Sequence, residues 1–208
     1  MDTALIFATD ATAPDSIVEE IPVADLVIAA DGGYDLAVRL GFAVDVLVGD
    51  LDSLDATTVP DHIVVERHPT DKEATDLELA LELVSRESPS RVVIVGGSGG
   101  RLDHELAGAA LICSPRWTHN IGTLDWLSSR GWAYVVWDRR IIHGDPGTVV
   151  SLIPMGGNAT GVVTKGLRWD LRDENLPHGT TRGVSNLMES PIADISLRSG
   201  CLLVVVAV

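Results

Sequence analysis

Residues 45–55 read DVLVGDLDSLD: a short apolar run ends at Gly49 and is followed by Asp50, Asp52 and Asp55. The apolar run is typical of a buried strand, and the glycine marks its end. Closely packed carboxylates repel one another, which disfavours ionisation unless a positive charge neutralises them. The stretch therefore predicts a strand with a site for a divalent cation at its carboxyl end. A turn is the alternative interpretation, because Asp and Ser side chains also stabilise turns.

Similar strands recur on both sides of this stretch, alternating with helical patterns up to about residue 137. The predicted strands are ALIFAT (4–9), DLVIAA (25–30), DVLVG (45–49), HIVVE (62–66), RVVIVG (91–96) and WAYVVW (132–137), and the predicted helices cover 34–40, 75–86 and 103–112. Such alternation predicts an α/β fold with a Rossmann-like, largely parallel sheet. In open sheets of this kind ligands gather beyond the carboxyl ends of the strands.

The pattern changes after Gly144, where short strands are separated by glycine, proline and asparagine and no helical period persists. Such a pattern is typical of an antiparallel all-β module, and we expect a β-sandwich. We therefore predict two domains, an α/β domain over residues 1–138 and a β-sandwich domain over residues 139–208.

Composition excludes several classes of function. The formal net charge of -15 over 208 residues argues against a nucleic-acid partner, since binding to phosphates needs a basic surface. No apolar stretch approaches the length of a membrane span, and the N-terminus lacks the basic region of a targeting peptide, so we expect a cytoplasmic protein with no membrane partner.

Cys113 and Cys201 are expected to be buried hydrophobic residues. The acidic, lysine-poor composition fits either a salty cytoplasm or an arginine-rich codon bias.

Three carboxylates are candidate ligands of the cation. Asp50 and Asp52 project to the same side of an extended segment, and Asp76 follows another predicted strand and can converge on the same ion. Ligation by oxygen alone suits Mg²⁺. An EF-hand loop is excluded by Leu54 and Asp55, and Leu54 is also a poor match to an aspartyl phosphatase. The DxD motif of a sugar-nucleotide transferase stays open.

The segment DKEATDLELALELVSR (71–86) opens a helix. Thr75 and Glu78 have the spacing of a capping box, so their expected role is structural. Asp76 would then lie in the first helical turn, where the helix dipole already favours an acid. Lys72 lies four residues earlier and is one of only two lysines in the chain.

Two glycine-rich stretches predict close approach of a ligand to the backbone. GGSGGRLDH (96–104) is neither a Walker A loop nor a dinucleotide fingerprint. It places a glycine loop before a helix N-terminus, which attracts phosphate, with Arg101 as a forked donor. Asp103 is either part of this site or the N-cap of the helix. ADGG (30–33) is a tight turn, and Trp169 in GLRWDL is either a core residue or a flat face for an aromatic or cationic ligand.

Taken in order, seven segments resemble the thiamine pyrophosphokinase family across nearly the whole chain. They are ADGGYDLAVRLG (30–41), GDLDSLD (49–55), TDLELAL (75–81), GGSGGRLDH (96–104), VSLIPM (150–155), GLRWDL (166–171) and SN (185–186). The resemblance implies a catalytic domain that binds the nucleotide and Mg²⁺, followed by a β-sandwich for thiamine binding and dimerisation. It also implies a reaction in which the pyrophosphoryl group of ATP moves to the hydroxyl of thiamine, giving thiamine diphosphate and AMP.

The resemblance assigns roles residue by residue. It implies Asp50, Asp52 and Asp76 as Mg²⁺ ligands and catalytic acids, with Arg101 and Asp103 completing the catalytic set. The implied nucleotide contacts are Asp31, Gly32, Gly33, Lys72, Thr75, Gly99, Gly100 and Arg101, and the implied thiamine contacts are Asp103, His104, Trp169, Ser185 and Asn186. Glu73 departs from the family, which usually has Asp at this position.

Two alternatives stay open, one an enzyme of the same fold and the other a protein of another class. A pyrophosphokinase of the same fold acting on a pterin alcohol would keep the acidic loops without needing GLRW and SN. A non-catalytic nucleotide-binding or thiamine-binding module would be expected to lack the acids. The resemblance further implies a homodimer, in which each active site joins the α/β domain of one subunit to the β-sandwich of its twin.

Overall fold

The computed structural model describes residues 1–50, 59–69 and 71–207, and within it the chain forms two compact units. Unit 1 comprises Met1–Gly108 and Trp117–Ser129, and unit 2 comprises Ala109–Arg116 and Arg130–Val208. Asp52 and Asp55 fall outside the described residues, so the structure says nothing of their positions.

Unit 1 contains a parallel sheet. Its strands are β1 (Thr3–Ala8), β2 (Leu26–Ala30), β3 (Val46–Gly49), β4 (Val64–Arg67), β5 (Arg91–Gly96) and β6 (Thr123–Ser128), in the spatial order β6-β5-β1-β2-β3-β4. Every pair of neighbours in this order is parallel. The chain leaves β1 toward β2 and later passes from β5 to β6 in the opposite direction. The topological switch point therefore lies between β1 and β5.

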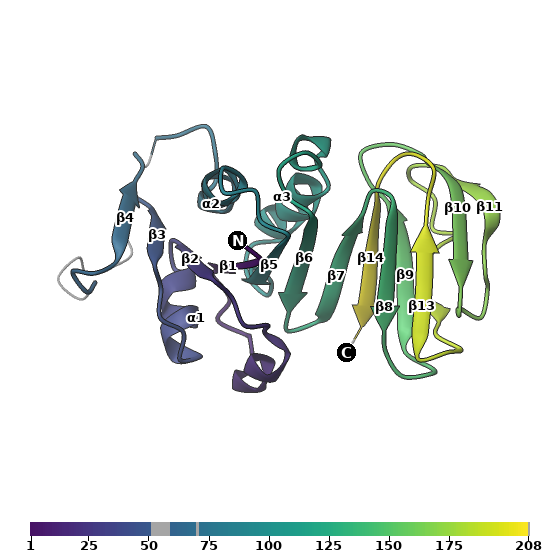
Figure 1. Ribbon diagram of the computed structural model, residues 1–208, viewed down its shortest axis with the longest axis horizontal. Coiled ribbons are helices and arrows are strands. Elements are labelled where there is room, and N and C mark those ends of the chain that lie inside the picture. Colours follow the sequence, from purple (N-terminus) through teal and green to yellow (C-terminus); the bar gives the residue numbers. More distant parts are fainter. Residues whose placement is uncertain (51–58, 70, 208) are drawn as a thin grey trace. The chain divides into compact units, whose positions relative to one another are not determined.

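Helices follow three of these strands: α1 (Gly33–Arg39), α2 (Asp76–Ser85) and α3 (Leu102–Ile112), with 3₁₀ turns at Asp15–Glu20 and Pro115–Trp117. Figure 1 shows α1 on one side of the strands and α2 on the other. Right-handed crossovers give this result, because the connection through α1 moves outward from the switch point and the connection through α2 moves back across it.

Burial explains why the central strand is an unbroken apolar run. Ala4, Leu5, Ile6 and Phe7 of β1 have no exposed surface, since β1 has a strand on each edge and helices over the sheet. At the edge of the sheet, β4 is mostly exposed, with Val64 at 63%. A short edge strand buries little surface and limits unwanted pairing with other chains.

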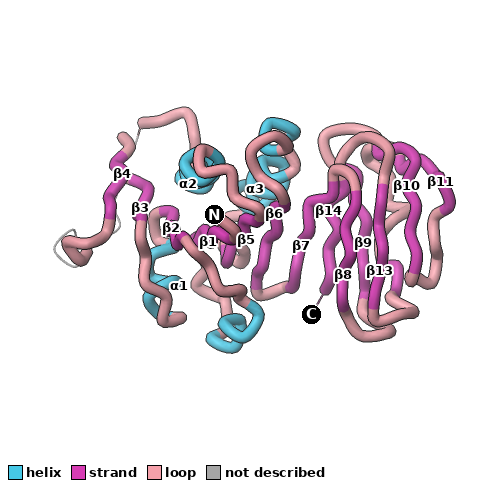
Figure 2. The backbone as a smooth tube through the Cα atoms, in the orientation of Figure 1, coloured by secondary structure: helices cyan, strands magenta, loops and turns pink. Residues whose placement is uncertain are grey.

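Unit 2 is an antiparallel β-sandwich. Its strands are β7 (Gly131–Val136), β8 (Arg139–His143), β9 (Val149–Pro154), β10 (Ala159–Lys165), β11 (Arg172–Leu176), β12 (Asn186–Leu187), β13 (Ile192–Ser196) and β14 (Leu202–Ala207). They form two layers, in the orders β12-β9-β14-β7 and β11-β10-β13-β8. Figure 2 shows these strands joined by loops. A common core that includes Leu152, Val162 and Ile195 packs between the layers.

The predicted fold class, an α/β unit followed by a β-sandwich, is confirmed. Two strand predictions need correction. The strand β6 was not predicted, because the run TLDWLS contains Asp125 and lacks a continuous apolar pattern. The predicted strand at 132–137 exists as β7, but it pairs antiparallel with β14 and belongs to unit 2.

Cys113 and Cys201 are buried and free of disulfide bonds, as expected. Their thiols also meet, which the sequence did not predict, since 113 and 201 lie in separate elements. The hydrogen bond between them, together with burial, raises the pKa of the Cys113 thiol. In the part of the chain that the structure describes, no helix is long and apolar enough to cross a membrane.

Gly33 offers a test of how tightly α1 packs on the sheet. A Cβ at this position would lie 2.0 Å from the carbonyl oxygen of Phe7 in β1. We expect Gly33→Ala to lower the free energy of unfolding by about 2–3 kcal/mol, because backbone cannot move aside as a side chain can. The matched control is Gly108→Ala in α3, where a Cβ would make ordinary contact at 3.4 Å with Trp126. Its effect should stay below about 1 kcal/mol in urea denaturation, and equal effects for the two variants would contradict this packing.

Candidate functional site

The polar loops of unit 1 share one edge of its sheet. Asp10 follows β1, Asp31 follows β2, Asp50 follows β3 and Ser98 follows β5. Because these strands are parallel, their carboxyl ends lie at the same edge. The fold therefore gathers side chains that are far apart in the sequence.

Three acidic segments approach one another at this edge. Asp31 has a left-handed backbone, with φ of 45°, and its N–H donates to the carbonyl of Val48 at 2.8 Å. A Cβ on Gly49 would lie 3.4 Å from both Asp76 Oδ1 and the Cα of Asp31. Asp31 and Asp76 therefore both border Gly49, and Asp50 is the next residue in the chain.

The turn DGG connects β2 to α1 beneath this cluster. Gly32 is the N-cap of α1 and Gly33 is its first residue. A Cβ on Gly32 would lie 2.9 Å from Thr9 Oγ1, so this turn packs directly against the segment that follows β1. The predicted nucleotide contacts Asp31, Gly32 and Gly33 thus lie at the edge of the sheet that carries the acids.

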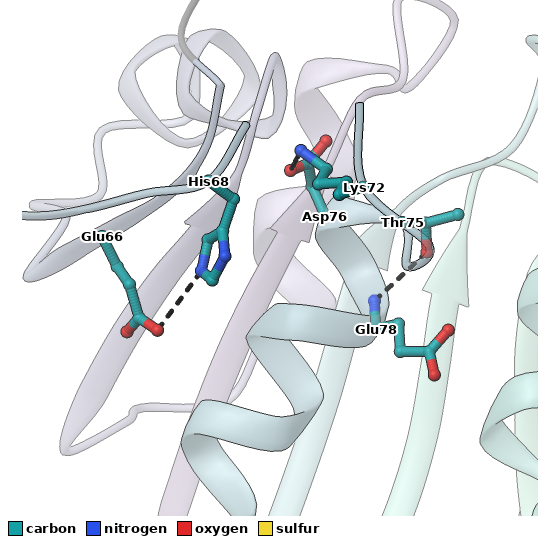
Figure 3. Close-up of polar contacts among 6 residues, drawn as sticks. All are labelled: Glu66, His68, Lys72, Thr75, Asp76 and Glu78. Atoms are coloured by element: carbon teal, nitrogen blue, oxygen red, sulfur yellow. Dashed lines mark hydrogen bonds and ion pairs between the residues drawn. The ribbon is translucent and has the colours of Figure 1, made fainter. Parts of the chain in front are cut away.

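Asp76 is the first residue of α2, and its partner is Lys72 (Figure 3). Lys72 Nζ donates to Asp76 Oδ1 at 2.7 Å, and the two side chains are only 15% and 23% exposed. Thr75 caps the helix, its Oγ1 accepting from the N–H of Glu78 at 3.3 Å, which confirms its expected structural role. The nearby His68 and Glu66 form a further pair at 3.3 Å.

The donor set at this edge fits a hard cation. Asp31, Asp50 and Asp76 offer only carboxylate oxygens, which Mg²⁺ prefers to nitrogen or sulfur. Among residues 1–50, 59–69 and 71–207, no three acidic, histidine or cysteine side chains are close enough to hold a metal ion by themselves. A complete set would therefore draw on Asp52, on substrate oxygens, or on both.

The glycine loop that follows β5 leads into α3. Asp103 lies in the first turn of α3, which begins at Leu102, so it is not the N-cap. Arg101 Nε donates to Asp103 Oδ1 at 3.1 Å, and a second bond joins Nη2 to Oδ2. The bond from Arg101 holds the pKa of the Asp103 carboxyl below its ordinary value, so Asp103 is ionised and is a weak proton acceptor in this pair. Both side chains and His104 are exposed.

Unit 2 carries a second site around Trp169. Asn186 is 6% exposed and is bonded to Trp169 twice. Its Nδ2 donates to the Trp169 carbonyl at 2.9 Å, and its Oδ1 accepts from the Trp169 N–H at 3.1 Å. The Trp169 side chain stays 57% exposed, with the Arg168 guanidinium 5.8 Å from its ring centroid. Asn186 thus fixes the backbone that presents the indole.

A pocket of about 280 Å³ lies beside the indole. Its lining includes Leu152, Trp169, Asp170, Glu174, Arg182 and Asn186. Sequence reasoning missed Glu174 and Arg182, which pair with each other across the pocket lining. No motif marks them, although Asp170 belongs to the GLRWDL segment. Ser185 has φ of 61° and bonds through its N–H to Ser151 Oγ at 3.1 Å, and it is not among the residues that line the pocket.

Two family models match the chain. One, described as "Thiamin pyrophosphokinase, catalytic domain", matches residues 18–122, and the other, described as "Thiamin pyrophosphokinase, vitamin B1 binding domain", matches residues 139–202. The acidic edge and the glycine loop fall in the first match, and the Trp169 pocket falls in the second.

Curated relatives carry the same name at modest identity. Thiamine pyrophosphokinase 1 of Oryza sativa subsp. japonica is 26% identical over 175 residues, covering 76% of this chain and 64% of the relative. Thiamine pyrophosphokinase 2 of Arabidopsis thaliana is 25% identical over 207 residues, covering 86% of this chain and 77% of the relative. The chain thus spans about two thirds of the rice protein's length.

Solved structures share the fold over essentially the whole chain. Thiamine pyrophosphokinase from Bacillus subtilis superposes with a TM-score of 0.85 at 22% identity, covering 99% of each chain. Thiamin pyrophosphokinase from Candida albicans gives 0.78 at 12% identity, covering 99% of this chain and 90% of the other. Together with the two family models, which match most of the sequence, these findings place the chain in the thiamin pyrophosphokinase family.

Proposed function

We propose that this protein is a thiamine diphosphokinase, which transfers the pyrophosphoryl group of ATP to the hydroxyl of thiamine and releases thiamine diphosphate and AMP. The observation that carries the proposal is the match of one chain to both the catalytic and the vitamin B1 binding models. Residues 1–138 would form the nucleotide- and Mg²⁺-binding catalytic domain, and residues 139–208 the domain for thiamine binding and dimerisation.

The acidic edge of unit 1 suits the phosphate half of the reaction. Asp50, Asp52 and Asp76 would hold Mg²⁺, which when bound neutralises charge on the phosphates and on the departing AMP. Lys72 contributes a positive charge at the same place, since its ammonium is already bonded to Asp76. The negative charge of the aspartates at this edge would therefore be offset by the Lys72 ammonium and by Mg²⁺.

The glycine loop and the start of α3 suit the rest of the polyphosphate. Gly99 and Gly100 are exposed, so backbone N–H groups there are accessible to phosphate oxygens. Arg101 supplies a forked cation next to them. The thiamine hydroxyl must lose a proton as it attacks the β-phosphorus, and Asp76 and Asp103 are the carboxylates proposed to accept it. Arg101 disfavours Asp103 in this role while the two remain paired.

The Trp169 pocket suits the thiamine half. The indole offers an aromatic face, which attracts cations such as the thiazolium ring. Asp170 adds negative charge to the pocket lining, where Glu174 is paired with Arg182. His104, Ser185 and Asp103 remain proposed thiamine contacts, and Asp31, Gly32, Gly33 and Thr75 remain proposed nucleotide contacts.

Neither alternative function accounts for both halves of the chain. A pterin pyrophosphokinase would need no vitamin B1 binding domain, and residues 139–202 match such a domain. A non-catalytic module would be expected to have lost its acids, yet Asp50, Asp52 and Asp76 are all present in the sequence. We further propose a cytoplasmic homodimer that binds no nucleic acid, in keeping with the net charge of -15.

Product analysis tests the reaction directly. Purified protein incubated with ATP, Mg²⁺ and thiamine should form AMP and thiamine diphosphate in equal amounts, since the bond between the α and β phosphates is the one that breaks. A pterin alcohol supplied in place of thiamine should give no AMP. Chromatographic detection of ADP and thiamine monophosphate would instead assign a simple phosphoryl transfer and contradict the proposal.

Mixed dimers test the shared active site. We expect Asp76→Asn to lower kcat/KM at least about 100-fold, because about 2.7 kcal/mol of transition-state stabilisation corresponds to that factor. Trp169→Ala should have a similar effect on thiamine turnover. After subunit exchange half of the dimers are mixed, and one site in each carries neither change, so activity should recover to roughly a quarter of wild type.

The matched control is Glu87→Gln, which also replaces an acid by an amide. Glu87 is exposed and lies just after the end of α2, so this change should leave activity unchanged. If exchange is demonstrated by native mass spectrometry and no activity returns, each site is built within one chain.

A further inference from the structure

The switch point of the sheet in unit 1 is bridged by a buried carboxylate. Asp10 follows β1 and Ser98 follows β5, so the two residues lie where the chain connections diverge. Asp10 is 4% exposed and Ser98 is 3% exposed. Open α/β sheets bind ligands in the crevice at this point, so a buried acid here needs an explanation.

Asp10 receives hydrogen bonds from both sides of the switch point. Its Oδ1 accepts from Thr12 N–H at 2.9 Å and from Thr12 Oγ1 at 2.7 Å. Its Oδ2 accepts from Ser98 Oγ at 2.8 Å and from Ser98 N–H at 3.4 Å. Four donors satisfy a carboxylate that burial would otherwise destabilise, and they tie two loops 88 positions apart in the sequence.

The glycine loop is fastened at its start as well. Trp126 of β6 donates through Nε1 to the Gly96 carbonyl at 2.5 Å. Gly99 packs against the other end of the bridge: its φ is +75°, and a Cβ there would lie 2.2 Å from Thr12 Oγ1. The loop is thus held at Gly96, at Ser98 and at Gly99, whereas nothing would lie within 4 Å of a Cβ on Gly100.

From these contacts we infer that Asp10 is a positioning residue for the nucleotide, holding the glycine loop so that the exposed backbone of Gly99 and Gly100 and the Arg101 side chain meet the phosphates of ATP. The inference rests on the proposed function. Asp10 does not touch the phosphates in this account; it acts through Ser98. A preformed loop binds phosphate more tightly than one that must be ordered first, because ordering costs conformational entropy.

Ser98→Ala is the decisive variant, since it removes the 2.8 Å bond to Asp10 and leaves every charge in place. The KM for ATP should rise about fivefold, the effect expected for one net hydrogen bond, while the KM for thiamine stays within about twofold. The matched control is Ser85→Ala in α2, which removes another buried serine bond of 2.8 Å, to the Glu82 carbonyl. Both variants should lose similar thermal stability, but only Ser98→Ala should change the KM for ATP.

Asp10→Asn extends the test to the carboxylate. An amide nitrogen facing Ser98 cannot accept its N–H, so the KM for ATP should rise about tenfold or more. The double variant should raise the KM for ATP no further than Asp10→Asn alone, because both changes act through the contact between Asp10 and Ser98. If Asp10→Asn does not fold, Ser98→Ala alone decides the matter.

A binding measurement separates this inference from the proposed function. Affinity for α,β-methylene-ATP in the presence of Mg²⁺, measured by calorimetry, requires no turnover. The inference is overturned, and the function left standing, if the wild type binds the analogue and Ser98→Ala binds it as tightly as the wild type. The same holds if Ser98→Ala binds it no more weakly than Ser85→Ala does. A wild type that forms no thiamine diphosphate but binds the analogue overturns the function, and one that binds no nucleotide overturns both.

Discussion

Close approach of loops at the carboxyl edge of unit 1 depends on glycine. A Cβ on Gly32 would lie 2.9 Å from Thr9 Oγ1, and a Cβ on Gly33 would overlap the backbone of β1. Gly99 likewise packs onto Thr12. These residues give up side-chain contacts of their own, so that three loops can lie against one another at the end of a parallel sheet. This packing sets the segment after β1 against both the DGG turn after β2 and the glycine loop after β5.

Bringing acids together creates an electrostatic cost that the chain meets in two ways. Lys72 neutralises Asp76 through a short, largely buried ion pair, and the N-terminus of α2 also favours the acid. Asp10 instead accepts four hydrogen bonds from Thr12 and Ser98. The difference fits two roles: Asp76 stays partly exposed and accessible to a metal ion, whereas Asp10 is enclosed and holds backbone.

Much of this arrangement could be predicted from local pattern. Apolar runs located β1, β2, β3 and β5, the last two ending in glycine, and a capping box located the start of α2. Strand β6 was not predicted because Asp125 interrupts its apolar run. The ion pair with Arg91 stabilises this buried acid in the strand.

The contacts that pattern could not reveal are those between distant loops. The bond between Asp10 and Ser98, the pair of bonds between Trp169 and Asn186, and the meeting of Cys113 with Cys201 all follow from strand order and register. No spacing in one sequence specifies which loops meet, so these contacts became visible only in three dimensions.

In the proposed function the acidic edge of unit 1 binds a nucleotide through a divalent cation, and the linkage between these two ligands can be measured directly. Calorimetric affinity for α,β-methylene-ATP should fall at least about tenfold, or about 1.4 kcal/mol, when Mg²⁺ is replaced by EDTA. In Asp76→Asn the affinity should be low and nearly independent of Mg²⁺. Equal affinity of the wild type with and without the cation would contradict the account.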